Sequence, residues 1–175
     1  MNFKQYFSTP ALPLNFAQYF RHLQIFFFAL LAGQILICAV LYFVYQPQEG
    51  ISPFQQDWVL KAWPFALVAL MVVGFFLNRR ILASANEKNR LADKLATYRI
   101  ASIQKWAMTE GGTLISALLF FETGNQQYLN LAGVAIAYFA TQFPSRQHLT
   151  EVLDLSANDQ ATLDDPNAIV FESSQ

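Results

Sequence analysis

The sequence predicts an all-α membrane protein, a bundle of four transmembrane helices with both chain ends in the cytoplasm. Three observations predict this fold class. Of the 175 residues, 54% are hydrophobic and only 13% are charged, whereas a typical soluble domain has about 25% charged residues. Residues 23–45 contain no charged side chain, and at about 1.5 Å per residue such a helix crosses a hydrocarbon core of about 30 Å. The basic residues gather in one stretch of the chain.

Four apolar stretches account for the predicted spans. They cover residues 23–45, 60–82, 106–121 and 128–143. We expect Pro64 in the first turn of the second helix, where its missing N–H costs nothing. The third and fourth stretches have only 16 residues each, so they need their flanks or a locally thinned bilayer to cross. Gly124, in the short polar stretch between them, suits the left-handed position that ends a helix, which predicts an antiparallel hairpin.

The first 22 residues are rich in aromatic side chains and precede the first span. They do not resemble a signal peptide, because the apolar run that follows is longer than the usual 7–15 residues and no small-x-small cleavage site follows it. We therefore expect an aromatic leader at the membrane surface, where rings contact acyl chains and polar tips contact water. Cys38, the single cysteine, lies in the first span, where we expect a small apolar space-filler.

The orientation follows from the distribution of lysine and arginine. The loop over residues 79–105 holds seven of the eleven. With four spans, Lys4, Arg21 and Arg146 lie on the same side of the membrane, and only Lys61 lies on the other. Because positively charged loops stay in the cytoplasm, a ratio of ten to one places this side and both termini there.

The loop between the second and third spans is itself predicted to contain a helix. Ser84 and Glu87 have the spacing of a capping box, and apolar residues recur at helical spacing over 91–98. We predict an amphipathic helix over residues 84–104 that lies along the cytoplasmic headgroups and bends into the third span. A coiled-coil stalk formed with a neighbouring subunit is the alternative. The expected headgroup contacts are Lys88, Arg90, Lys94, Arg99 and Lys105.

Residues 149–175 form an acidic tail. They contain six Asp and Glu and no Lys or Arg, whereas the loop over 79–105 has a net charge of +5. The tail also carries an apolar stripe around Leu149 and Leu153. Two hypotheses follow: the tail docks on the basic helix through an attraction that salt screens, or it stays solvated and frayed.

Glu110 is the one carboxylate inside a predicted span, about one turn from its cytoplasmic end. A carboxylate at this depth is costly unless it is paired, hydrated or protonated. The favoured interpretation is a structural ion pair with Arg79 or Arg80; the alternatives are a role in handling protons or ions, and simple snorkelling to the interface. Small residues at Gly111, Gly112 and Gly133 predict surfaces where another helix can approach closely.

No pattern in the sequence predicts catalysis, a cofactor or a metal. His22 and His148, the only histidines, both fall near the cytoplasmic interface, unlike a pair of haem ligands placed within the bilayer. The sequence has no Cys-x-x-Cys, His-Glu-x-x-His, Walker, dinucleotide-binding or Gly-x-Ser-x-Gly motif. The basic loop does not predict nucleic-acid binding, because topology and anionic lipid explain basic residues beside a span.

The stretch from Trp106 to Gly111, together with Thr123-Gly124-Asn125, resembles a pattern in small four-span bacterial membrane proteins of uncharacterised function. The resemblance covers about the second half of the chain, supports the hairpin of the third and fourth spans and implies no activity. We therefore expect a multi-pass protein of a bacterial inner membrane.

The expected function is that of a non-enzymatic accessory, assembly or scaffold subunit. It would act through helix contacts and its charged cytoplasmic face, with partner subunits or further copies of itself. The alternative is a small homo-oligomeric channel or transporter, although the polar residues within the spans are sparse for a pore. A membrane enzyme comes third.

Overall fold

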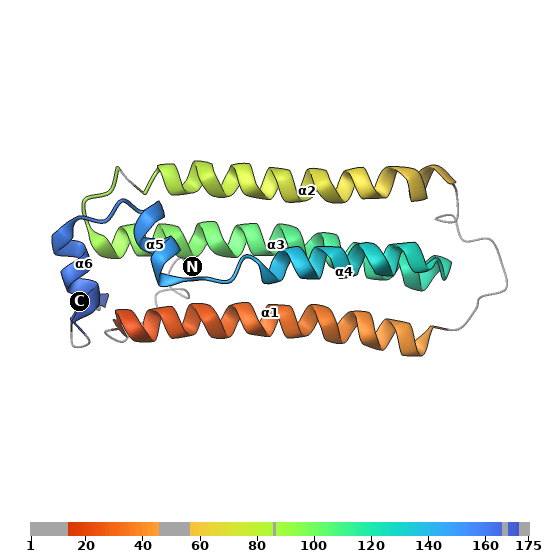
Figure 1. Cartoon of the computed structure of the whole chain (residues 1–175), viewed down its shortest axis with the longest axis horizontal. Helices are drawn as coiled ribbons and strands as arrows, with labels where there is room; N and C mark the ends of the chain where they lie inside the picture. The colour runs from red at the N-terminus through yellow and green to blue at the C-terminus, as the bar shows by residue number, and fades with distance from the viewer. Residues whose placement is uncertain (1–13, 46–56, 86, 166–167, 172–175) are drawn as a thin grey trace, which may run out of the picture.

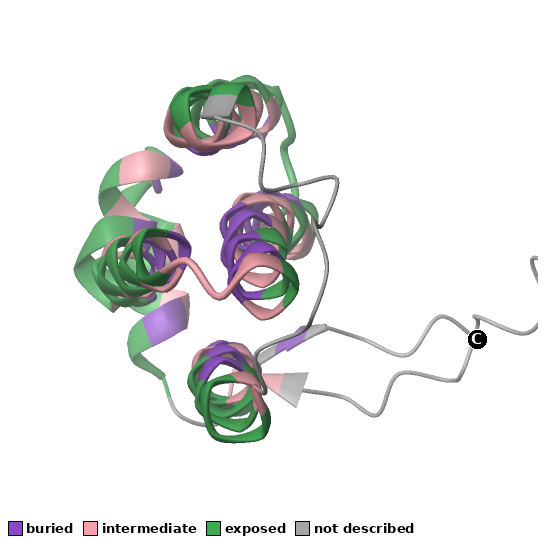
Figure 2. Cartoon of the chain, turned by 90° about the vertical axis from the view of Figure 1, so that its right-hand side faces the viewer, coloured by how far each residue is buried: buried purple, intermediate pink, exposed green. Residues whose placement is uncertain are grey.

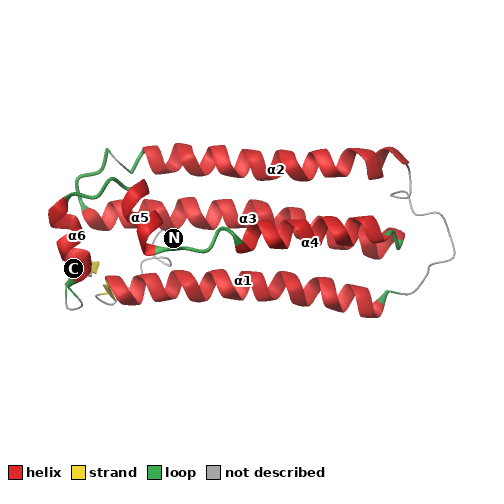
Figure 3. Ribbon diagram, in the orientation of Figure 1, coloured by secondary structure: helices red, strands yellow, loops and turns green. Residues whose placement is uncertain are grey.

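The computed structural model describes residues 14–45, 57–85, 87–165 and 168–171. In chain order the elements are β1 (Leu14–Asn15), α1 (Phe16–Val44), α2 (Asp57–Ala83), α3 (Leu91–Thr123), α4 (Gln126–Ala140), α5 (Arg146–Val152), α6 (Ala157–Asp164) and β2 (Ile169–Phe171) (Figure 3). The two short strands pair antiparallel, with Leu14 opposite Phe171. The described part of the chain is thus built almost entirely of helices, and the predicted all-α class is confirmed.

Helices α1 to α4 lie side by side and alternate in direction, and α5 and α6 lie at the end where α1 begins and α2 ends (Figure 1). Helix α3 is central, because it packs against α1, α2 and α4, whereas α2 packs chiefly against α3. Exposed residues cover the outer faces of α1 and α2 (Figure 2). This arrangement leaves two long apolar helices on the outside of the bundle.

Helix α1 begins earlier than the predicted first span. Asn15 caps it: the Asn15 side chain accepts a hydrogen bond from the Gln18 backbone N–H at 2.9 Å, and the Gln18 side chain accepts one from the Asn15 N–H at 3.3 Å. Phe16 and Tyr19 are buried on its first turns. The last part of the predicted leader, residues 16–22, therefore belongs to this helix, and residues 1–13 lie outside the described residues.

Helix α2 contains Pro64 in its interior. The expectation that Pro64 lies in the first turn is wrong, because the helix begins at Asp57. A proline has no N–H for the carbonyl of Leu60, four residues before it. Nearby, the Trp63 indole N–H donates to the Ser116 hydroxyl at 2.8 Å and ties this part of α2 to α3.

The predicted interfacial helix over residues 84–104 is wrong in both its start and its bend. The Ser84 hydroxyl donates to the Ile81 carbonyl at 2.6 Å and forms no capping box. Helix α3 begins at Leu91 and continues for 33 residues to Thr123. It needs no bend, because the apolar stripe of its first half, including Leu95 and Tyr98, is buried by the rest of the chain and needs neither lipid nor a coiled-coil partner.

The predicted hairpin of α3 and α4 is confirmed. Gly124 ends α3 with φ of +68°, and its N–H donates to the Phe120 carbonyl at 2.7 Å. The Asn125 side chain accepts from the Gln127 N–H at 3.0 Å and caps α4. Helix α4 has 15 residues and ends at Ala140, before Pro144.

The tail is packed onto the end of the bundle, as the docking hypothesis expects. Its leucines are fully or almost fully buried in one cluster with residues of α1 and α3: Leu149, Leu153, Leu155 and Leu163 with Phe16, Tyr19, Leu23, Leu95 and Tyr98. The Tyr19 hydroxyl, buried in this cluster, donates to the Leu95 carbonyl at 2.7 Å. Among the described residues, one ion pair, Lys94 with Asp159 at 3.9 Å, joins the basic half of α3 to the tail. Apolar contact therefore contributes more to docking than charge.

Candidate functional site

The outer faces of α1 and α2 are the largest candidate functional surface. By length and hydropathy, Phe16–Val44 and Trp58–Ala83 could each cross a membrane, and only 11% of the most apolar 18-residue window of each is buried. Large apolar side chains on these faces are exposed: Phe43 is 82%, Phe65 77% and Phe76 63% exposed. Proteins surrounded by water rarely expose apolar surface so continuously, which makes a lipid or protein partner the expected neighbour.

Helices α3 and α4 are less suited by length and composition to cross a membrane than α1 and α2. Helix α4 has 15 residues, and α3 carries buried polar side chains along its middle, including Thr109, Thr113 and Ser116. Each of these hydroxyls donates to the carbonyl four residues earlier, at 2.8–3.2 Å. Because α3 packs against three other helices, these three hydroxyls are satisfied within the bundle and the composition of α3 need not be uniformly apolar.

Glu110 is not paired as the sequence led us to expect. The ion pairs among the described residues are Lys94–Asp159 and Arg146–Asp164, so in this part of the chain neither Arg79 nor Arg80 forms an ion pair with Glu110. The Arg79 guanidinium carbon instead lies 5.8 Å from the centre of the Phe75 ring, a cation–π contact within the same helix.

The predicted packing glycines divide into two kinds. A Cβ at Gly112 would lie 2.5 Å from Cδ1 of Leu67, so this glycine allows α2 and α3 to approach closely. Gly74, on α2, also allows this close approach, because a Cβ there would lie 3.1 Å from Cβ of Met108. Gly74 was not among the predicted packing glycines. Gly111 and Gly133 have nothing within 4 Å of such a Cβ, so they face open space.

The five basic residues expected at lipid headgroups also divide. Lys88 donates to the Thr97 hydroxyl at 2.6 Å, and Lys94 pairs with Asp159. Arg90 and Arg99 are exposed. Lys105 is half-buried and lines a cavity. Two of the five are thus used inside the chain, two are free for headgroups, and Lys105 belongs to a separate site.

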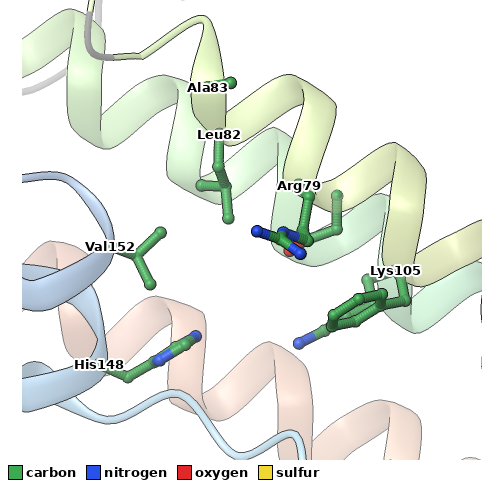
Figure 4. Close-up of a pocket in the computed structure, with 8 residues that line it drawn as sticks. Arg79, Leu82, Ala83, Lys105, His148 and Val152 are labelled. Atoms are coloured by element: carbon green, nitrogen blue, oxygen red, sulfur yellow. The ribbon is translucent and has the colours of Figure 1, made fainter.

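That cavity, of about 450 Å³, lies where α2, α3 and α5 meet. Figure 4 shows Arg79 from α2, Lys105 from α3 and His148 from α5 directed into the same space. Asn78 and the apolar side chains Phe75, Leu82, Ala83 and Val152 complete its lining. No aspartate or glutamate is among these described lining residues, so the cavity is positively charged and has one apolar side.

Burial and mutual repulsion affect the basic groups of this cavity. Burial lowers the pKa of Lys105. The pKa of His148 is lowered by burial and then by the positive charge of Lys105, with Glu151 acting in the opposite direction. Both shifts show that burial disfavours the charged forms of these two groups, and at His148 the neighbouring Lys105 adds to the effect. Nothing in the sequence indicated that His148 joins this cavity, because Lys105 and Arg79 lie 43 and 69 residues away in the chain.

Gln34 is a further polar group within the bundle. Its side chain, on α1, is fully buried, and neither amide atom has a hydrogen-bond partner among the described residues. Gln142 donates to the Thr109 hydroxyl at 3.2 Å and ties the segment after α4 to α3. Gln34 and Gln142 therefore point into this single chain, whereas Asn130 is exposed.

Comparison with protein families, with curated proteins and with solved structures found no match. The described residues contain no group of three or more His, Cys, Asp or Glu that could hold a metal ion. The resemblance of the second half to four-span bacterial membrane proteins accordingly stays a prediction.

Proposed function

We propose that this chain is an integral protein of a bacterial inner membrane, in which α1 to α4 all cross the bilayer, and that it serves as a non-enzymatic accessory, assembly or scaffold subunit. The observation that carries the proposal is the exposure of α1 and α2, whose most apolar windows are only 11% buried. Apolar side chains of this size are accepted by lipid tails, and the helices satisfy their own backbone hydrogen bonds, as a bilayer requires.

The placement of α3 and α4 across the membrane is supported by their neighbours. Helix α3 packs against α1 and α2, and α4 packs against α1 and α3 (Figure 1). Their outward residues are apolar too, with Leu118 54% and Val134 61% exposed. The basic loop and the tail meet at one end of the bundle, whereas Lys61 belongs to the other end. This polarity supports a cytoplasmic location for the end with α5 and α6.

The role as a subunit is supported by the glycines that the chain does not use itself. Gly111 and Gly133 face open space, and within a membrane such small-residue surfaces let a neighbouring helix approach closely. The homo-oligomeric channel is less well supported, because Gln34 and Ser116 are fully buried inside one copy and Ser116 is bonded to Trp63. These groups are not available to line a path between copies.

Membrane insertion and orientation can be tested together. In a Cys38→Ala background, Ser84→Cys and Gln127→Cys each place one thiol at an exposed position, at opposite ends of the bundle. A membrane-impermeant maleimide should label position 127 on spheroplasts and position 84 only after permeabilisation. The parent Cys38→Ala protein is the control for background labelling. The reverse pattern, or recovery of the protein in the soluble fraction without detergent, contradicts the proposal.

The role as a subunit needs a separate test, by native mass spectrometry after extraction in a gentle detergent. A hetero-complex is expected, and Gly133→Leu should dissociate it without lowering the thermal stability of the isolated chain. Val134→Leu, an exposed neighbour already large and apolar, is the matched control. A homo-oligomer that conducts ions in planar bilayers would instead establish the channel.

A further inference from the structure

The basic cavity brings together two cations, Arg79 and Lys105, and the His148 imidazole, with no carboxylate among its described lining residues. Arg79, Lys105 and His148 line it together, and in the described part of the chain none of the three forms an ion pair. The nearest carboxylate that acts on His148 is Glu151, one turn further along α5; its side chain accepts a hydrogen bond from Gln147 at 3.0 Å. The cavity therefore lacks an anion of its own.

A partly buried cation without a partner is unfavourable, because the protein interior solvates it less well than water. Of the three groups this applies to Lys105, since Arg79 and His148 are exposed. Lys105 is half-buried, and Figure 4 shows its amine directed toward the same space as the Arg79 guanidinium and the His148 ring. Three donors from three different elements suit an oxyanion, since arginine and lysine donate charge-assisted hydrogen bonds to phosphate oxygens. The Asn78 amide, also in the lining, offers a further donor.

The other side of the cavity is apolar and continues onto the membrane-facing surface. Phe75, Leu82 and Val152 line it, and Phe75 is 46% exposed beside Phe76 on the outer face of α2. A volume of about 450 Å³ lies within the range of about 300–1,000 Å³ usual for ligand sites. A molecule that joins a phosphate to an acyl chain would match both sides.

We propose that Arg79, Lys105 and His148 bind the phosphate of an anionic phospholipid in the cytoplasmic leaflet, with an acyl chain running along Phe75 and the outer face of α2. This inference rests on the proposed membrane placement, which brings the cavity to the level of the headgroups. A free phosphate shares the same chemistry for the three donors. The apolar wall and the continuity with α2 favour the lipid.

The test uses the full-length protein purified in a nonionic detergent and native mass spectrometry. Dioleoyl-phosphatidylglycerol is titrated against dioleoyl-phosphatidylcholine, whose choline group adds a positive charge to the site, and against inorganic phosphate. Tighter binding of phosphatidylglycerol is expected. Arg79→Gln and Lys105→Gln should each weaken it about tenfold, the cost of one charge-assisted hydrogen bond.

Arg80→Gln is the matched control, because Arg80 is the next residue of the same helix, has the same charge and does not line the cavity. Its binding should equal that of the unchanged protein. Equal loss in Arg80→Gln and Arg79→Gln would mean unspecific attraction and would overturn the proposal. So would equal binding of the two lipids, or binding of inorganic phosphate as tight as that of phosphatidylglycerol.

A second measurement covers the case in which the variants fail to fold. In the unchanged protein, NMR titration of the imidazole groups should show the pKa of His148 rising when phosphatidylglycerol replaces phosphatidylcholine in nanodiscs. Lys105 and Glu151 are the charged groups that act on His148, and Arg79 lines the same cavity from α2. An unchanged pKa of His148 would overturn the proposal. Failure to enter nanodiscs would instead contradict the membrane placement itself.

Discussion

The tail should be held to the bundle by its leucines rather than by its ion pairs, and Leu153→Ala tests this. Leu153 is completely buried in the cluster that joins the tail to α1 and α3, and a Leu→Ala change at such a position costs about 2–5 kcal/mol. The Lys94–Asp159 pair is long, at 3.9 Å, and a partly exposed pair of this kind contributes about 1 kcal/mol at most. The apolar contribution should therefore dominate.

A glutamate-specific protease can measure the difference, because Glu151 lies exposed on α5. When opening is fast compared with cleavage, the rate follows the fraction of open tail. Leu153→Ala should raise this rate about 30-fold or more, since about 2 kcal/mol is the least expected loss. Screening the ion pair with 1 M NaCl should raise it about fivefold or less.

Cleavage after Glu87, in the loop before α3, serves as an internal control and should not change. Leu118→Ala is the matched variant, since Leu118 is 54% exposed on α3 and the same atoms are removed outside the cluster. A salt effect larger than that of Leu153→Ala would refute the reasoning and restore charge as the main contribution. An unchanged rate in Leu153→Ala would show that the tail does not open through this cluster.

Three further predictions concern the bundle. Gly124→Ala should lower the free energy of unfolding by at least about 1–2 kcal/mol, because φ of +68° is strained for a residue with a Cβ and this Cβ would also overlap the Tyr45 hydroxyl; thermal unfolding in detergent measures this. Ser116→Ala should cost about 1–3 kcal/mol in the same assay, because the Trp63 indole N–H loses its acceptor. Burial raises the pKa of Tyr98 to about 12, against the effect of a hydrogen bond with Ser102. Since folding favours its neutral form, Tyr98 should contribute full stability below pH 10 and lose it as the pH rises from about 10 to about 12.

Each of these predictions has its own control. Gly133→Ala is the control for Gly124→Ala. A Cβ at Gly133 has nothing within 4 Å, so this change should be neutral or stabilising by up to about 1 kcal/mol. An equal loss of stability at Gly133 and Gly124 would contradict the prediction for Gly124. For the second, adding Trp63→Phe to Ser116→Ala should cost less than the sum of the single changes; strict additivity would show that the bond is not the cause. For the third, Tyr98→Phe should flatten the alkaline fall in stability, and an unchanged fall would assign it to other groups.

Much of the fold could be predicted because local chemistry determines it. Gly124 ends α3 because a residue without a Cβ accepts a positive φ, and the polar residues around it follow from the same turn. The apolar stretch over 23–45 requires a helix whatever surrounds it, since every backbone group must be bonded in an apolar setting. These features depend on residues within one or two turns of each other.

Other features could not be predicted in this way. A proline is common in the first turn of a helix, yet α2 begins seven residues before Pro64, at Asp57. The helical spacing of Leu95 and Tyr98 shows that this helix has an apolar face. The spacing is the same whether lipid, a partner chain or the tail covers that face, so it does not identify the covering group. The tail buries it in the structure, and α3 then continues without a bend.

The sequence by itself determined the helical class, the hairpin and the end of the bundle that carries the basic residues, because each depends on composition or on neighbouring residues. Only the tertiary structure decided that α3 is central, that the tail is packed onto it, and that Arg79, Lys105 and His148 share one cavity. The physical reason is the range of the interactions. Helix formation and chain reversal are local, whereas burial and charge compensation depend on segments that are distant in sequence and meet only when the bundle forms.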